Sequence, residues 1–151
     1  MCFRLDTRSV SHRRAGSQKG LPVAIVVMGI CGTAAAQQPS IVGTWEWTRK
    51  ANGCTERYVF RDNGTLAVTS GDESTENVYR MSWTPEPTGR YKVTVKTVKD
   101  HGGRDCADSL ADDTGLERVL YILFGGSQQT MIACGTPAGP DCIGPLRRAA
   151  P

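Results

Sequence analysis

The sequence has few of the residues and motifs on which enzyme mechanisms depend. It contains two histidines in 151 residues and no Gly-x-Ser-x-Gly motif that would expose a nucleophilic serine. His101, the one histidine after residue 36, lies in the segment His-Gly-Gly-Arg-Asp with no recognisable nucleophile or carboxylate pair. General acid–base and covalent catalysis both need such partners within hydrogen-bonding reach. We therefore expect a protein that is not an enzyme, with no catalytic residues and no cofactor.

Metal-ligand patterns are also missing. There is no Cys-x-x-Cys pair, and no histidine accompanies a cysteine at zinc-ligand spacing. Acidic residues gather in segments 72–76 and 105–117. Calcium favours several such oxygens, but the spacing is not that of an EF-hand loop. We predict that these carboxylates keep exposed loops solvated and that no metal is bound.

Long apolar segments are absent as well. The apolar run from Leu21 to Ile30 is too short for a comfortable transmembrane helix. Basic residues precede it and Ala34-Ala35-Ala36 follows, which is typical of a secretory signal with a small-residue cleavage site. We predict a signal peptide over 1–36 and a periplasmic or secreted mature protein over 37–151. The alternative is an uncleaved anchor, so that any contact with a membrane is made through this segment.

Positive charge is not in excess once the signal is removed. The chain has a formal net charge of +3. Residues 1–36 contain five basic residues and one acidic residue, so the mature chain has a net charge of about −1. Nucleic-acid binding needs a basic patch that neutralises phosphates, so we expect no nucleic-acid partner.

Four cysteines remain after residue 36, namely Cys54, Cys106, Cys134 and Cys142. An even number in an exported chain predicts two disulfides, formed in an oxidising compartment. Three pairings are open. We favour Cys54–Cys106 with Cys134–Cys142, because the second pair would close a hairpin loop.

The rest of the chain shows the period-two pattern of β-strands and no helical period. In segment 90–97, apolar residues at 91, 93 and 95 alternate with polar residues. Turn residues such as Asn63-Gly64 separate the strands at short intervals. We predict one all-β domain, an antiparallel up-and-down meander of about eight strands closed into a small barrel, and we expect a monomer. The predicted strands are 41–49, 54–61, 65–70, 75–83, 89–99, 117–124, 128–134 and 141–147.

Strands that alternate up and down place all four cysteines at one end of this barrel. The turn before 54, the loop 100–115 and the last hairpin loop all fall there. Two disulfides require this, because bridged Cα atoms must approach within about 7 Å. The two acidic segments lie at the same end.

The first strand carries Gly43-Thr44-Trp45, and the last ends in Arg147-Arg148. A first-strand Gly-x-Trp, an eight-stranded meander and a basic C-terminal residue resemble the calycin superfamily of lipocalins, fatty-acid-binding proteins and avidins. The resemblance implies a lipocalin-like barrel in which Gly43 and Trp45 close the floor. It also implies that Arg147 or Arg148 packs across the indole in a cation–π contact.

Aromatic residues at inward positions bear on whether the barrel is hollow. Eight strands enclose a space that side chains just fill or that holds one small ligand. The bulk of these aromatics favours a filled interior. A cavity, if present, would suit a small apolar molecule entering between the disulfide-tied loops. The candidate ligand-lining residues are Trp47, Tyr58, Phe60, Tyr79, Trp83 and Tyr91.

Three functions fit this picture. The first is binding of a small hydrophobic ligand. The second is a protein-interaction role, such as inhibition of a lysozyme-like envelope or host hydrolase, with the acidic loop 100–115 as the contact. The third is a structural role in the envelope. A cavity above Trp45 would favour the first, and a filled barrel with an ordered, protruding loop would favour the second.

Overall fold

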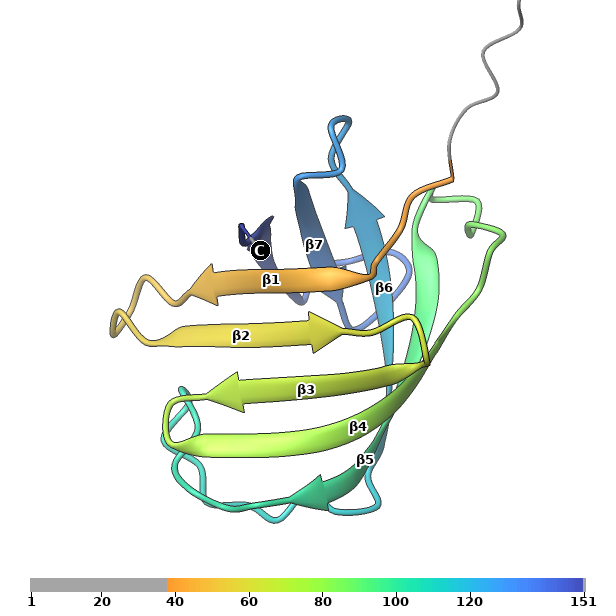
Figure 1. Ribbon diagram of the computed structural model, residues 1–151. Helices are drawn as coiled ribbons and strands as arrows, with labels where there is room; N and C mark the ends of the chain where they lie inside the picture. The colour runs from red at the N-terminus through yellow and green to blue at the C-terminus, as the bar shows by residue number, and fades with distance from the viewer. Residues whose placement is uncertain (1–37, 151) are drawn as a thin grey trace, which may run out of the picture. The chain divides into compact units, whose positions relative to one another are not determined.

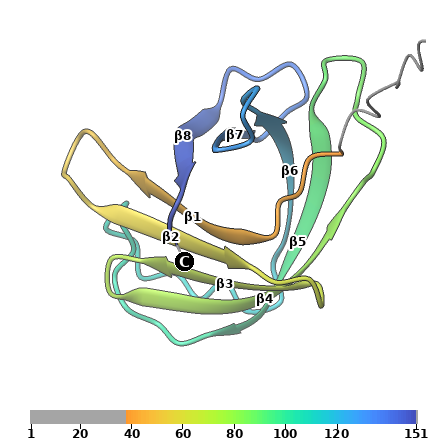
Figure 2. The same cartoon turned by 45° about the horizontal axis from the view of Figure 1, so that its top comes forward.

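Eight strands pair in chain order, and the last pairs with the first to close the sheet (Figure 1). The computed structural model describes residues 38–150, so the predicted signal peptide over 1–36 lies outside the described residues. The strands are β1 (Gly43–Thr48), β2 (Thr55–Phe60), β3 (Thr65–Ser70), β4 (Glu73–Met81), β5 (Tyr91–Asp100), β6 (Glu117–Phe124), β7 (Thr130–Cys134) and β8 (Cys142–Arg148). The turned view in Figure 2 shows β6, β7 and β8 curving round towards β1.

The predicted all-β barrel is therefore confirmed. Each predicted strand is present, and its ends differ from the prediction by at most two residues. No helix within residues 38–150 is long and apolar enough to cross a membrane.

The core is built from every second residue of the strands. Successive side chains of a strand point to opposite faces of the sheet, so one set faces the interior and the other faces solvent. On β3, for example, Leu66 is buried and Thr69 is exposed. The buried apolar residues form one cluster, which comprises Ile41, Trp45, Phe60, Leu66, Val93, Ile122, Met131, Ala133 and Leu146.

Trp45 closes the floor of the barrel. Its side chain is fully buried, and its indole N–H donates a hydrogen bond to the carbonyl oxygen of Ile41 at 2.7 Å. The guanidinium carbon of Arg148 lies 4.2 Å from the centre of the Trp45 ring system. Of the two arginines that the resemblance offered for this contact, Arg148 makes it. Arg147 is exposed and points to the outer face.

Arg148 also ties the end of β8 to the segment that precedes β1. Its Nη1 donates to the carbonyl oxygen of Val42 at 2.6 Å, and its Nη2 donates to that of Ser40 at 2.9 Å. Gly43 lies beside this guanidinium with a φ of +129°, and a Cβ at Gly43 would collide with Nη1 of Arg148. The Gly-x-Trp motif is thus explained by close approach of the arginine, which only glycine permits.

The position of Trp83 differs from the prediction, which placed it inside the barrel. The strand that was expected to continue to residue 83 ends at Met81, so the inward–outward alternation stops before Trp83 is reached. Trp83 lies in the β4–β5 connection and is 66% exposed. It does not belong to the barrel interior.

Replacement of Arg148 by alanine should destabilise the barrel more than the same change at Arg147. The first variant loses a cation–π contact and two charge-assisted hydrogen bonds, for which we expect a loss of about 2–3 kcal/mol in the free energy of unfolding. The second variant removes an exposed side chain, with an expected effect within about 0.5 kcal/mol. Urea denaturation followed by tryptophan fluorescence measures both. Equal losses would contradict the role given to Arg148.

Candidate functional site

The upper half of the barrel is hollow. A cavity of about 270 Å³ lies between the buried core and the end of the barrel that carries the cysteines. Ordinary ligand pockets have volumes of about 300–1,000 Å³, so this one suits a small molecule. Its apolar lining comprises Tyr58, Phe60, Leu66, Val68, Val95, Leu120, Ile122, Met131, Ala133, Ile143 and Leu146.

The sequence predicted an interior filled by side chains. The interior is filled in this way only near the floor. There the rings of Trp45 and Phe124 lie 6.1 Å apart, and Tyr91 packs against Phe124. Higher up, several inward positions carry small side chains, such as Ser70 and Ala133. These side chains leave the space unfilled.

One wall of the cavity is polar. Residues 38–150 contain four buried polar residues, and all four line this cavity; they are Ser70, Thr75, Asn77 and Thr97. They come from the adjacent strands β3, β4 and β5, and Asn77 is paired directly with Thr97 across the β4–β5 ladder. The wall formed by β6, β7 and β8 is apolar below Arg118. The cavity therefore has one hydrogen-bonding side and one hydrophobic side.

The upper rim of the cavity is charged. It is lined by Glu56, Glu73, Asp105, Asp113 and Arg118. Nη2 of Arg118 donates to Oδ2 of Asp113 at 2.7 Å, which neutralises one of the four carboxylates. The rim residues carry a formal charge of −3, from four carboxylates and one guanidinium.

Two ionisable side chains at this rim, Tyr58 and Glu73, have pKa values raised above their ordinary values. Burial, together with the charge of Glu56 and the hydrogen bond to it, raises the pKa of Tyr58, so the phenol keeps its proton. Partial burial raises the pKa of Glu73, and the nearby carboxylates of Asp100, Asp105 and Asp113 raise it further. The neighbouring charges thus disfavour the ionised form of Glu73.

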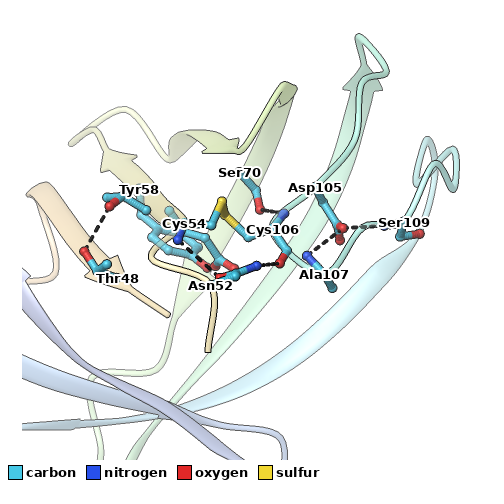
Figure 3. Close-up of a disulfide and its surroundings, with 11 residues drawn as sticks. Thr48, Asn52, Cys54, Tyr58, Ser70, Asp105, Cys106, Ala107 and Ser109 are labelled. Atoms are coloured by element: carbon cyan, nitrogen blue, oxygen red, sulfur yellow. Dashed lines mark hydrogen bonds between the residues drawn. A yellow bond between two sulfur atoms is a disulfide. The ribbon is translucent and has the colours of Figure 1, made fainter. Parts of the chain in front are cut away.

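The Cys54–Cys106 disulfide joins the loop between β5 and β6 to the residue just before β2 (Figure 3). Asp105 of this loop lines the rim. Asn52 Nδ2 donates to the carbonyl oxygen of Cys106 at 2.9 Å, and the amide N of Cys106 donates to Ser70 Oγ at 3.0 Å. In the same loop, Oδ1 of Asp105 accepts from the amides of residues 107 and 109 at 2.8 and 2.7 Å. The position of the Asp105 carboxylate is therefore fixed by the backbone around it.

The second disulfide, Cys134–Cys142, closes the β7–β8 hairpin with Cα atoms 4.0 Å apart. Both predicted pairings are confirmed. Two disulfides in a small domain are typical of a protein from an oxidising compartment.

The predicted ligand-lining aromatics are dispersed. Tyr58 and Phe60 line the cavity. Tyr79 packs edge-on against Phe60, with ring centres 5.0 Å apart, and Tyr91 packs near the floor. Trp47 is half-buried and lies beside Gly144 and Pro145, where β1 and β8 diverge. Together with the exposed Trp83, four of the six candidates therefore lie outside the cavity lining.

The sequence analysis did not single out the aliphatic lining residues, nor the inward polar residues such as Ser70, Thr75, Asn77, Thr97 and Arg118. They continue the inward alternation of their strands, since Asn77 lies two residues before Tyr79 and Thr97 lies two residues after Val95. Polar side chains at inward positions of an otherwise apolar series were the available signal.

Within residues 38–150, no three His, Cys, Asp or Glu residues lie close enough together to hold a metal ion. Nε2 of His101 lies 2.9 Å from a carboxylate oxygen of Glu76, and both side chains are exposed.

Comparison with known proteins identifies no similar protein. No family model, no curated protein and no solved structure matches this chain. The class is therefore defined by the fold and the site alone. It is a small, disulfide-bonded, closed antiparallel barrel with an internal cavity, and this architecture is consistent with a lipocalin-like fold.

Loss of the two disulfides should have unequal effects. Cys54–Cys106 spans 52 residues and Cys134–Cys142 spans 8. The chain-entropy relation gives stabilisations of about 4 and about 2.5 kcal/mol. The double serine variant of the first pair should therefore lose more stability in urea denaturation than that of the second pair. The reverse order would show that loop closure is not the main contribution.

Glu73→Gln should raise stability at pH 7, and this gain should fade in acid. The pKa of Glu73 is raised in the folded state, so its ionisation opposes folding above that pKa. Protonation removes the penalty as the pH falls towards the ordinary pKa near about 4.3. The measurement is the urea midpoint of both proteins at pH 7 and pH 4. Glu117→Gln, which removes a carboxylate on the outer face at the start of β6, is the matched control.

Proposed function

We propose that this protein is a lipocalin-like, non-enzymatic binding protein that acts in the periplasm or outside the cell. It holds a small, largely apolar molecule inside the barrel. The observation that carries the proposal is the cavity of about 270 Å³ above the core, with its mouth at the disulfide-tied end. The protein functions as a monomer.

The chemistry of the lower cavity supports an apolar ligand. Leu66, Ile122, Met131 and Leu146 are nearly fully buried and form the bottom of the cavity. Transfer of apolar surface from water to such a site contributes about 25 cal/mol per Å². The walls are β-strands and the mouth is cross-linked, so little conformational freedom is lost on binding.

A second candidate is interaction with a cationic protein through the loop between β5 and β6. It is favoured by the fixed position of this loop and by its exposed acidic residues, such as Asp108 and Asp112. The hollow interior favours the small-molecule function over this one. Substitutions within the cavity separate the two, because they do not alter the outer surface of the loop.

Occupation of the cavity by a bulky side chain should abolish ligand binding. Val68 lines the cavity, whereas its neighbour Thr69 is exposed on the outer face. We expect Val68→Phe to lower the affinity for a neutral fluorescent probe, 1-aminoanthracene, by about tenfold or more, and Thr69→Phe to leave it unchanged. The readout is probe fluorescence during titration. Thermal unfolding checks that both variants are folded.

Unchanged affinity in Val68→Phe would place the probe outside the barrel. Absence of binding by the natural chain to the probe and to C8 alkyl compounds would overturn the small-molecule proposal.

A further inference from the structure

Two acceptor atoms in the polar wall of the cavity have no hydrogen-bond partner among the described residues. They are Oδ1 of Asn77 and Oγ1 of Thr97. The residues are only 5% and 4% exposed, and both line the cavity. Both oxygens belong to largely buried residues and face the cavity, where a bound group could supply the missing hydrogen bonds.

The orientation of the Asn77 amide is fixed by its neighbours. Nδ2 of Asn77 donates to the carbonyl oxygen of Leu66 at 3.3 Å and to Oγ1 of Thr75 at 2.9 Å. A backbone carbonyl only accepts, so the nitrogen must face Leu66. Oδ1 is then the atom left without a donor.

Thr97 shows the same situation. Its backbone N–H and carbonyl bond to residues 116 and 115, whereas its hydroxyl bonds to no described residue. Within residues 38–150, Nε of Arg90 is the one fully enclosed side-chain polar atom without a partner. Asn77 Oδ1 and Thr97 Oγ1 are not enclosed in this way, so a ligand in the cavity can reach them.

The rim above these two atoms carries negative charge that the protein does not neutralise. Among the described residues, the carboxylates of Glu56, Glu73 and Asp105 form no ion pair with lysine or arginine. Glu56 accepts a hydrogen bond from Tyr58, and Asp105 accepts from two backbone amides. Low-dielectric walls strengthen the field of such charges inside the cavity.

We propose that the ligand of this cavity is a small amphiphile with a primary ammonium group. The ammonium lies against Asn77 Oδ1 and Thr97 Oγ1 beneath the acidic rim, and the apolar part extends towards Leu146 and Ile122. This inference rests on the proposed function and specifies the chemical class of its ligand.

An ammonium group fits because it has three donors and no acceptor, which complements two unpartnered oxygens. Its positive charge is attracted by the rim. A carboxylate could accept from the Thr97 hydroxyl, but it would place an acceptor against Oδ1 of Asn77 and a negative charge beneath a rim with a formal charge of −3. Arg118 does not reverse this preference, because it is already paired with Asp113.

The test compares three ligands with the same chain and different heads. Octan-1-amine, octan-1-ol and octanoate are titrated into the protein by calorimetry at pH 7, where the amine is protonated. We expect the amine to bind about tenfold or more tightly than the alcohol, and the alcohol more tightly than the acid. The amine's advantage should diminish between 50 mM and 500 mM salt if the rim charges cause it.

Variants locate the head group. Thr97→Val preserves shape and backbone bonds but removes the hydroxyl. We expect it to weaken amine binding about three- to tenfold. The double variant Glu73→Gln/Asp105→Asn removes two negative charges. The asparagine keeps a side-chain oxygen that can accept the hydrogen bonds from the amides of residues 107 and 109. It should weaken amine binding about tenfold and leave octanol binding unchanged. Glu117→Gln, on the outer face, is the matched control and should change neither.

The outcomes separate this inference from the function on which it rests. Equal binding of the three ligands, or tighter binding of octanoate, would overturn the ammonium assignment and leave the binding function intact. Binding of none of them, together with failure of the neutral probe, would overturn both. Amine binding that is unaffected by Thr97→Val and by the double variant would place the ammonium elsewhere on the protein.

Discussion

Closure of the sheet between β1 and β8 is the constraint on which the rest of the barrel depends. The two strands pair at only two positions, Trp45 with Arg148 and Glu46 with Arg147. Arg148 strengthens this short seam by covering the indole and by binding the carbonyl oxygens of Val42 and Ser40. The segment before β1 is thereby drawn across the floor. Because the floor is closed in this way, the interior opens only at the opposite end, where the cysteines lie.

Much of this architecture follows from alternation along the chain. The period-two pattern predicted the strands, and the strand directions brought the four cysteines to one end, where both pairings formed. Alternation could not predict where a strand stops, so Trp83 was misplaced. It also could not predict the cavity. The hollow depends on which inward residues share a level in the barrel, and this depends on register and on the irregularities at Glu76/Asn77 and Met131/Ala133.

The proposed site sets the stability of the fold against the binding of a ligand. The acidic rim gathers like charges around Glu73, and the wall below it leaves the oxygens of Asn77 and Thr97 without donors. The gathered like charges do not stabilise the barrel. Proteins accept such local costs where a ligand later compensates them, which is the usual relation between a binding site and the stability of its scaffold. In the proposed binding function, the polar wall and the rim act together as two parts of one recognition surface.

The floor and the mouth of the barrel are made by different residues. Gly43, Trp45 and Arg148 hold the fold together, and none of them lines the cavity. The mouth is formed by strand ends and by a loop that the Cys54–Cys106 disulfide anchors. Substitutions at the rim can therefore accumulate without loss of the scaffold. Such separation is a condition for evolvability: one frame can acquire new specificities while natural selection maintains its stability at the opposite end.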